Sequence, residues 1–170
     1  MTPLDLCNNA LSLLGEKPIH GIDPLGNDAQ RMCHLHYHTV RREVLRAHAW
    51  LFAMEHATLD SFANEDPQGY AIPHTVPIDA LRIVACDPPG WTQRGKQIFA
   101  RPQKIKIYYT RDEEDLDLWS ADALFCFTNL LAVKMCIYLT NNTTLRQELM
   151  AQYNTKLKSI TNPTKQPWTQ

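Results

Sequence analysis

The sequence lacks an excess of charge of either sign, and it lacks a recognisable targeting segment. Lysine and arginine together number 17 and aspartate and glutamate 18, which gives a formal net charge of -1. We therefore expect no general attraction to nucleic acid or to an anionic membrane. Residues 1–14 carry no cationic stretch ahead of their apolar side chains, and no apolar run approaches the roughly 18 to 20 residues of a membrane span. The expectation is a protein made and kept in the cytosol, without a membrane partner.

The cysteines lack the spacing of a disulfide framework or of a zinc site. Their number, five, is odd, and no two of them form a C-x-x-C pair, the spacing that cysteine zinc sites use. We predict reduced and buried thiols at all of these positions, which are Cys7, Cys33, Cys86, Cys126 and Cys136.

A complete set of metal ligands is missing as well. His34 and His38 stand near Cys33 and His36, and on a helix they share a face at the i, i+4 spacing that can hold a metal. Two ligands do not make a site, and no H-E-x-x-H motif accompanies them. We expect no metal and no cofactor, and histidines that are solvated or lie in an interface.

Catalytic groups are equally hard to find. No glycine-rich elbow surrounds any cysteine, which argues against a cysteine–histidine nucleophile. The acidic run at residues 112–115 could supply the paired carboxylates of a glycoside hydrolase. The same pattern is more typical of a solvated loop that leads into a helix. We predict a protein that is not an enzyme.

Four helices are indicated by apolar spacing and by capping residues. Thr2 and Pro3 start the first, which ends at Gly15, and Asn27 starts a second that reaches about residue 50. Ser120 starts a third helix to about residue 139, apolar on nearly all sides and therefore expected to be central. A capping box of Thr144 and Gln147 predicts a fourth helix to about residue 160.

Between the second and third helices the apolar period changes to that of strands. Short β-rich pieces at residues 51–59, 80–86 and 104–110 are separated by proline, glycine and asparagine clusters. Residues 104–109 alternate as a strand with one solvated face should. The predicted fold class is α+β, mainly α: a four-helix arrangement with a small antiparallel β insertion between the second and third helices. We expect a single domain at residues 1–160, with the insertion at about 51–110, and a flexible C-terminal tail at 161–170.

A basic band is predicted on the polar face of the second helix. Arg31, Arg41, Arg42 and Arg46 lie there together with His34 and His38. Interleaved aromatic residues, which a nucleic-acid face usually adds, are missing. An ordinary solvated face and a lining near passing DNA remain alternatives, and we favour a subunit interface over both.

Several stretches of the sequence are similar to one known family. Residues 10–19 (ALSLLGEKPI) resemble an opening in which an apolar helix ends in Leu-Gly-Glu and continues to a Pro-Ile turn. Residues 41–53 (RREVLRAHAWLFA) resemble a second signature, a long helix that ends in a Trp-x-Phe-Ala entry to a strand. Residues 70–73 (YAIP) and 79–84 (DALRIV) resemble the Tyr-x-x-Pro and Asp-x-Leu-Arg segments that follow. The family is that of tail tubular protein A, the head-to-tail adaptors of short-tailed phages, and the likeness extends to about residue 160.

The resemblance implies a structural virion protein at the head-tail junction. It implies a dodecameric ring beneath the portal protein that joins the portal to a downstream tail tube or nozzle protein, with a channel for DNA ejection. Its partners would be the portal, the nozzle, further copies of itself and, without sequence specificity, the passing DNA. The alternatives are a head-tail connector of a long-tailed phage or gene transfer agent and a virion-associated cell-wall hydrolase.

The last ten residues are expected to contribute a portal-binding tail. Pro163 and Pro167 disfavour a helix there, and Trp168 is the kind of large aromatic that fills a partner's pocket. The family resemblance favours this interpretation over a passive terminus.

Overall fold

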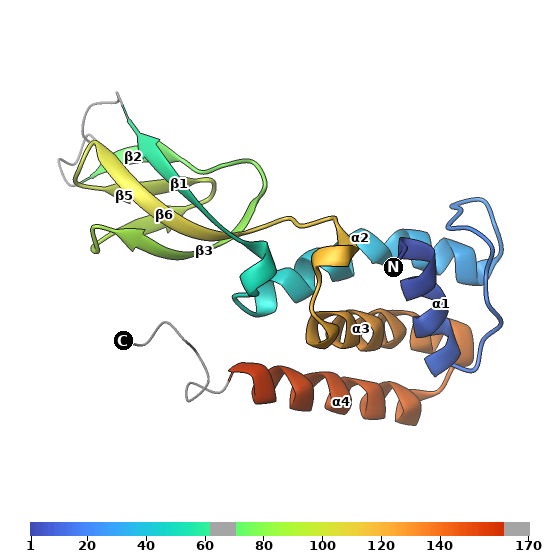
Figure 1. Cartoon of the computed structure of the whole chain (residues 1–170). Coiled ribbons are helices and arrows are strands. Elements are labelled where there is room, and N and C mark those ends of the chain that lie inside the picture. Colours follow the sequence, from blue (N-terminus) through green and yellow to red (C-terminus); the bar gives the residue numbers. More distant parts are fainter. Residues whose placement is uncertain (62–70, 162–170) are drawn as a thin grey trace. The chain divides into compact units, whose positions relative to one another are not determined.

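The computed structural model describes residues 1–61 and 71–161, which form two compact units (Figure 1). The helical unit takes residues 1–48 and the chain from residue 114 onward, and the β unit takes residues 49–113. The described helices are α1 (Pro3–Leu13), α2 (Asp28–Ala47), α3 (Ala121–Thr140) and α4 (Thr143–Thr161). The described strands all lie between α2 and α3, so the predicted α+β class with a β insertion is confirmed.

The helix starts follow from local capping chemistry. Thr2 accepts a hydrogen bond from the backbone of Asp5, whose carboxylate accepts one from Thr2 in return, a capping box that satisfies two free backbone donors. Gly15 ends α1 with a positive φ of 73°, the left-handed conformation that glycine adopts without strain. Asn27 and Ser120 cap α2 and α3 as predicted.

The start of α4 differs from the prediction. The helix begins at Thr143, and the Asn142 side chain accepts the hydrogen bond from the Leu145 backbone at 3.0 Å. The capping box predicted for Thr144 and Gln147 was therefore wrong by two residues. Asn141 ends α3 in the left-handed region at a φ of 51°. The next residue, Asn142, caps the start of α4.

The α3 helix is the centre of the helical unit. It packs against α1, α2 and α4, and Figure 1 shows it between α2 and α4. Its buried side chains point to several sides, because the consecutive residues Leu130, Leu131, Ala132 and Val133 are all buried. By length and composition α3 could cross a membrane, so the expectation that no apolar run reaches that length was wrong. More than half of its apolar window, 56%, is buried inside the protein, as a core helix requires.

The β unit contains two three-stranded antiparallel sheets. The first has the order β1 (Met54–Asp60), β6 (Lys104–Arg111), β3 (Ala80–Asp87), and the second has β2 (Ile72–Thr75), β5 (Gln97–Ala100), β4 (Thr92–Arg94). Strands β1, β3 and β6 are the three predicted ones. Strand β1 starts three residues later than predicted, because residues 51–53 form a 3-10 turn. Strands β2, β4 and β5 were not predicted.

The core of the β unit is a cluster of aliphatic side chains with one buried histidine. Ile98, Ile105 and Ile107 are essentially inaccessible to solvent. His74 on β2 is buried, with Nδ1 2.9 Å from the carbonyl oxygen of Ile72 and Nε2 3.2 Å from that of Gln103. The histidine thereby ties an edge strand to the turn before β6.

Candidate functional site

The basic band of α2 divides into exposed and buried members. Arg31, Arg42 and Arg46 are exposed, as predicted. Arg41 is only 3% exposed, so its placement on the outer face of the helix was wrong. Its guanidinium Nη2 lies 2.6 Å from a carboxylate oxygen of Glu114, on the segment before α3.

The burial of Arg41 follows from its position in the helical repeat. It stands four residues after Tyr37 and four before Leu45, both of which are buried, and residues at that spacing share a face. Burial raises the pKa of the neighbouring Tyr37 hydroxyl to about 12, while the charge of Arg41 opposes this rise. The i, i+4 spacing of Arg41 with Tyr37 and Leu45 could have indicated in the sequence that Arg41 is buried.

The outward face of α2 carries a row that we call the α2 ridge: Arg31, Leu35, His38, Arg42 and Arg46. These residues follow one another at steps of three and four, so they line one side of the helix, and all five are exposed. Leu35 is 60% exposed in the middle of the basic side chains. Sequence reasoning found the charges of this ridge and missed the leucine.

The histidine cluster does not assemble a metal site. His34 and His38 are exposed, whereas Cys33 is buried with its sulfur 3.7 Å from that of Met135. In residues 1–61 and 71–161, no three His, Cys, Asp or Glu side chains are grouped so that they could hold a metal ion.

Removal of divalent metals is expected to leave the melting temperature unchanged, because structural zinc sites need four ligands. Thermal unfolding followed by circular dichroism, with and without a chelator, tests this. A fall in melting temperature that zinc reverses would contradict the expectation and would direct attention to His34 and His38.

The surroundings of two cysteines, Cys7 and Cys126, make these thiols unreactive. All five are free and buried. A hydrogen bond with Cys33 and burial raise the pKa of the Cys7 thiol, and burial raises the pKa of Cys126 to about 11. Since the thiolate is the reactive form, Cys7 and Cys126 are protonated and unreactive at neutral pH.

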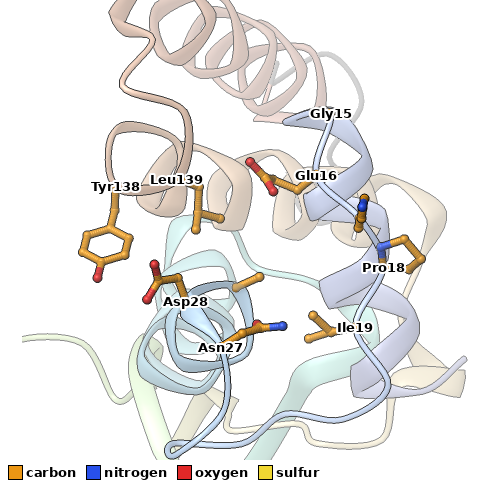
Figure 2. Close-up of a pocket in the computed structure, with 10 residues that line it drawn as sticks. Gly15, Glu16, Pro18, Ile19, Asn27, Asp28, Tyr138 and Leu139 are labelled. Carbon is orange, nitrogen blue, oxygen red and sulfur yellow. The ribbon is translucent and has the colours of Figure 1, made fainter.

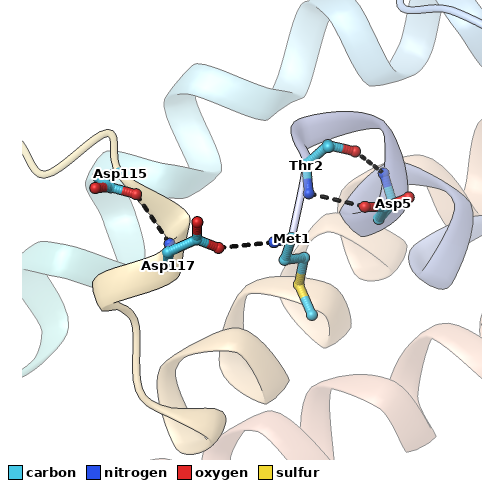
Figure 3. Close-up of polar contacts among 5 residues, drawn as sticks. All are labelled: Met1, Thr2, Asp5, Asp115 and Asp117. Atoms are coloured by element: carbon cyan, nitrogen blue, oxygen red, sulfur yellow. Dashed lines mark hydrogen bonds and ion pairs between the residues drawn. The ribbon is translucent and has the colours of Figure 1, made fainter.

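The acidic run before α3 is engaged in specific contacts. Glu113 is buried and pairs with Arg111, which corrects the expectation of a fully solvated loop. Asp115 accepts a hydrogen bond from the Asp117 backbone, and the Asp117 carboxylate binds the Met1 amine at 2.8 Å (Figure 3). That hydrogen bond raises the pKa of the amine.

A groove runs over α3 between α1 and α4. A hollow of about 370 Å³ is lined by residues that include Leu13 from α1, Phe125 and Asn129 from α3, and Gln152 from α4. A second hollow of about 450 Å³ continues past Phe125 and Gln152 between α3 and α4. We call the two together the α1–α3–α4 groove.

The groove exposes the part of α3 that neither α1 nor α4 covers. Leu149 and Tyr153 are the buried residues of α4, while α3 is apolar on most sides and leaves Phe125 42% exposed. Asn129 lies at the floor and is 2% exposed. Its amide nitrogen donates to the carbonyl of Phe125 at 3.0 Å, and its side-chain oxygen finds no donor in the described part of the chain. Such an orphaned acceptor is costly unless a partner supplies a donor.

A third hollow, of about 510 Å³, opens where the loop after α1 passes the start of α2 and the end of α3 (Figure 2). The Asn8 side chain secures this loop, since it donates to the Ile19 carbonyl at 3.1 Å and accepts from the Ile19 amide at 2.8 Å. On the opposite wall Asn27 caps α2 and Asp28 pairs with Arg31. The polar groups of these three residues therefore serve the local fold.

Pro163, Pro167 and Trp168, the predicted portal-binding tail, lie outside the residues that the structure describes. Comparison of the sequence with known protein families finds no match, and comparison with curated proteins finds none either.

Proposed function

We propose that this chain is a structural virion protein, a head-to-tail adaptor that forms a ring beneath the portal and joins it to the tail around a DNA channel. The supporting observation is architectural. The resemblance to tail tubular protein A implies a helical bundle with a β insertion, and the order α1, α2, six described strands, α3, α4 agrees with that arrangement.

The exposed surface of the helical unit is compatible with a role in assembly. The α2 ridge presents three arginines and Leu35 on one side, and the α1–α3–α4 groove exposes Phe125 and Leu13 on another. Exposed apolar side chains gathered in a hollow are typical of binding surfaces. Arg31, Arg42 and Arg46 are the charges that we assign to subunit contacts, and Arg41 is withdrawn from that set because it is buried.

Electron microscopy of the purified protein, alone and mixed with the portal protein encoded in the same genome, tests the proposal. The expected result is a ring stacked coaxially on the portal. A protein that stays monomeric and does not bind the portal would contradict it. A ring that binds a long-tailed particle would keep the structural class and support the connector of a long-tailed phage instead.

Deletion of residues 161–170 is expected to weaken portal binding greatly and to leave helix content and melting temperature nearly unchanged. Trp168→Ala alone should account for a large part of the loss, about 2 kcal/mol, as for an aromatic residue at an interface hot spot. Surface plasmon resonance with immobilised portal measures the affinity, and circular dichroism is the control for folding. Equal affinity of the truncated and full-length chains would refute the role of the tail.

A further inference from the structure

The β unit contains a long stretch of chain without an acidic residue. Residues 88–111 include six lysine or arginine side chains and no aspartate or glutamate, in a chain whose formal net charge is -1. Three of the six have acidic neighbours: Lys104 pairs with Asp60, Arg111 pairs with Glu113, and Lys106 stands opposite Asp87 on the adjacent strand. The other three are exposed, and within residues 1–61 and 71–161 none of them forms an ion pair: Arg94, Lys96 and Arg101. Positive charge is therefore left uncompensated around β4 and β5.

The β2–β5–β4 sheet turns one face to the core of the β unit and the other to solvent. Ile98 and Ala100 of β5 are buried in that core, so Gln97 and Phe99 point to the opposite face. The residues of β4 that stand opposite these two in the antiparallel register, a threonine and an arginine, share the outward face. Together with the basic residues just before and just after β5, they form a surface that we call the basic sheet face: Thr92, Arg94, Lys96, Gln97, Phe99 and Arg101.

The aromatic ring of the basic sheet face holds one of its arginines in place. The guanidinium carbon of Arg94 lies 5.2 Å from the centroid of the Phe99 ring, over the ring face. This cation–π contact positions the guanidinium at the surface and does not use its N–H donors. It also covers the ring, so a nucleobase could not stack on Phe99 without displacing Arg94. The face is therefore better suited to a phosphate backbone than to unpaired bases.

The polar groups of the basic sheet face are of the kinds that bind phosphate oxygens. Arg94 and Arg101 carry planar guanidinium groups that can contact a phosphate through two N–H groups, and Lys96 supplies an ammonium group. The hydroxyl of Thr92 and the amide of Gln97 add neutral donors. Strands β2, β4 and β5 contain no carboxylate that would repel a polyanion. Such a set of donors recognises a DNA backbone without reading its sequence.

From these features we propose that the basic sheet face contacts the phosphate backbone of double-stranded DNA without sequence specificity. Arg94, Lys96 and Arg101 supply the charge, and Thr92 and Gln97 donate further hydrogen bonds. The charge of the face selects a polyanion, and the choice of double-stranded DNA rests on the proposed function, in which the genome passes through the ring. The contact assigns the β unit, rather than the basic band of α2, as the part of the chain that meets DNA.

Fluorescence anisotropy with a labelled duplex of random sequence tests the contact on the full-length chain. The affinity is measured at several sodium chloride concentrations for the wild type and for a charge-removal variant that combines Arg94→Gln, Lys96→Gln and Arg101→Gln. Each phosphate that a cation contacts adds about 0.9 to the steepness of log affinity against log salt concentration. The variant should therefore bind more weakly at low salt, with a slope that is shallower by about 2.7 for contacts from one chain. Contacts from several chains of a ring would make the difference larger.

A matched control removes the same amount of charge from lysines that have acidic partners. It combines Lys104→Gln, Lys134→Gln and Lys156→Gln, each of which removes one member of an ion pair outside the basic sheet face. We expect this control to keep the salt slope of the wild type. Circular dichroism shows whether both variants are folded. If the charge-removal variant is not, Arg101→Gln alone replaces it, with an expected change in slope of about 0.9.

The DNA contact would be overturned by a wild-type chain that does not bind the duplex at low salt, or by equal slopes for the two variants. Tighter binding of single-stranded DNA, or of poly-glutamate as a model of an acidic protein, would assign the face to another partner and would also overturn it. Electron microscopy of the same chains with the portal tests the proposed function separately. A ring on the portal whose DNA affinity is unchanged in the charge-removal variant would leave only the adaptor proposal standing. DNA binding that the variant loses, in a chain that forms no ring and does not bind the portal, would support the DNA contact and count against the adaptor.

Discussion

Arg41→Glu is expected to unfold the helical unit under conditions in which the wild type is folded. The substitution places a second carboxylate opposite Glu114, at a position that is 3% exposed. Removing one partner of a buried ion pair costs about 3 to 5 kcal/mol. We expect a loss of about 3 kcal/mol, near the lower end of that range, because Glu114 itself is largely exposed to water. The free energy of unfolding of a typical domain is about 5 to 15 kcal/mol, so a loss of this size is a large share of it.

Arg42→Glu is the matched control, because it makes the same change one residue later at an exposed position. Surface charge changes usually alter stability by no more than about 0.5 kcal/mol. Urea unfolding followed by far-ultraviolet circular dichroism gives both values. Arg41→Met, which keeps the length of the side chain and removes its charge, should be less damaging than Arg41→Glu. Equal unfolding midpoints for the Arg41→Glu and Arg42→Glu chains would mean that Arg41 is not a buried charge.

Phe127→Ala is expected to lower the free energy of unfolding of the helical unit by about 3 to 5 kcal/mol, the usual cost of removing a buried phenylalanine. Phe127 is completely buried on α3. Its ring centroid lies 5.2 Å from that of Tyr37 on α2 and 5.9 Å from that of Trp119 before α3. Truncation would leave a cavity between two aromatic side chains, Tyr37 and Trp119, which come from separate segments.

Phe125→Ala serves as the control for Phe127→Ala, since it removes the same atoms from the same helix at a half-exposed position. We expect it to cost less than about 1 kcal/mol, because only the covered part of the ring loses contacts. A Phe125→Ala chain as unstable as Phe127→Ala would show that the groove floor belongs to the core.

The helix starts were predictable because their signals are local. Thr2 with Asp5, Asn27 with Gln30, and Ser120 each satisfy backbone donors within three residues, and no distant contact is needed to recognise them. The start of α4 was misplaced because two adjacent polar segments, at residues 141–142 and 144–147, both fit the capping pattern. The structure selects Asn142.

The positions that escaped prediction depend on distant partners. The i, i+4 row places Arg41 on the buried face of α2, but its ion-pair partner, Glu114, is 73 residues away in the sequence and could not be identified from it. Strands β2, β4 and β5 have three or four residues each, too few for an alternating pattern, and their pairing defines them. The groove was unpredictable because α3 is apolar all round, so the sequence alone does not show which part α4 leaves uncovered.

The helical unit is discontinuous along the chain, and this delays its folding during synthesis. A ribosome completes residues 49–113, the whole β unit, before it reaches α3. The α1 and α2 helices meet each other little and bury their apolar faces mainly against α3. Until residue 140 has been made, these two helices have no core to join, while the strands behind them can already pair. The apolar faces of α1 and α2 therefore stay exposed in the nascent chain until α3 has been made. Chaperones and other unfinished chains can bind these faces until α3 covers them.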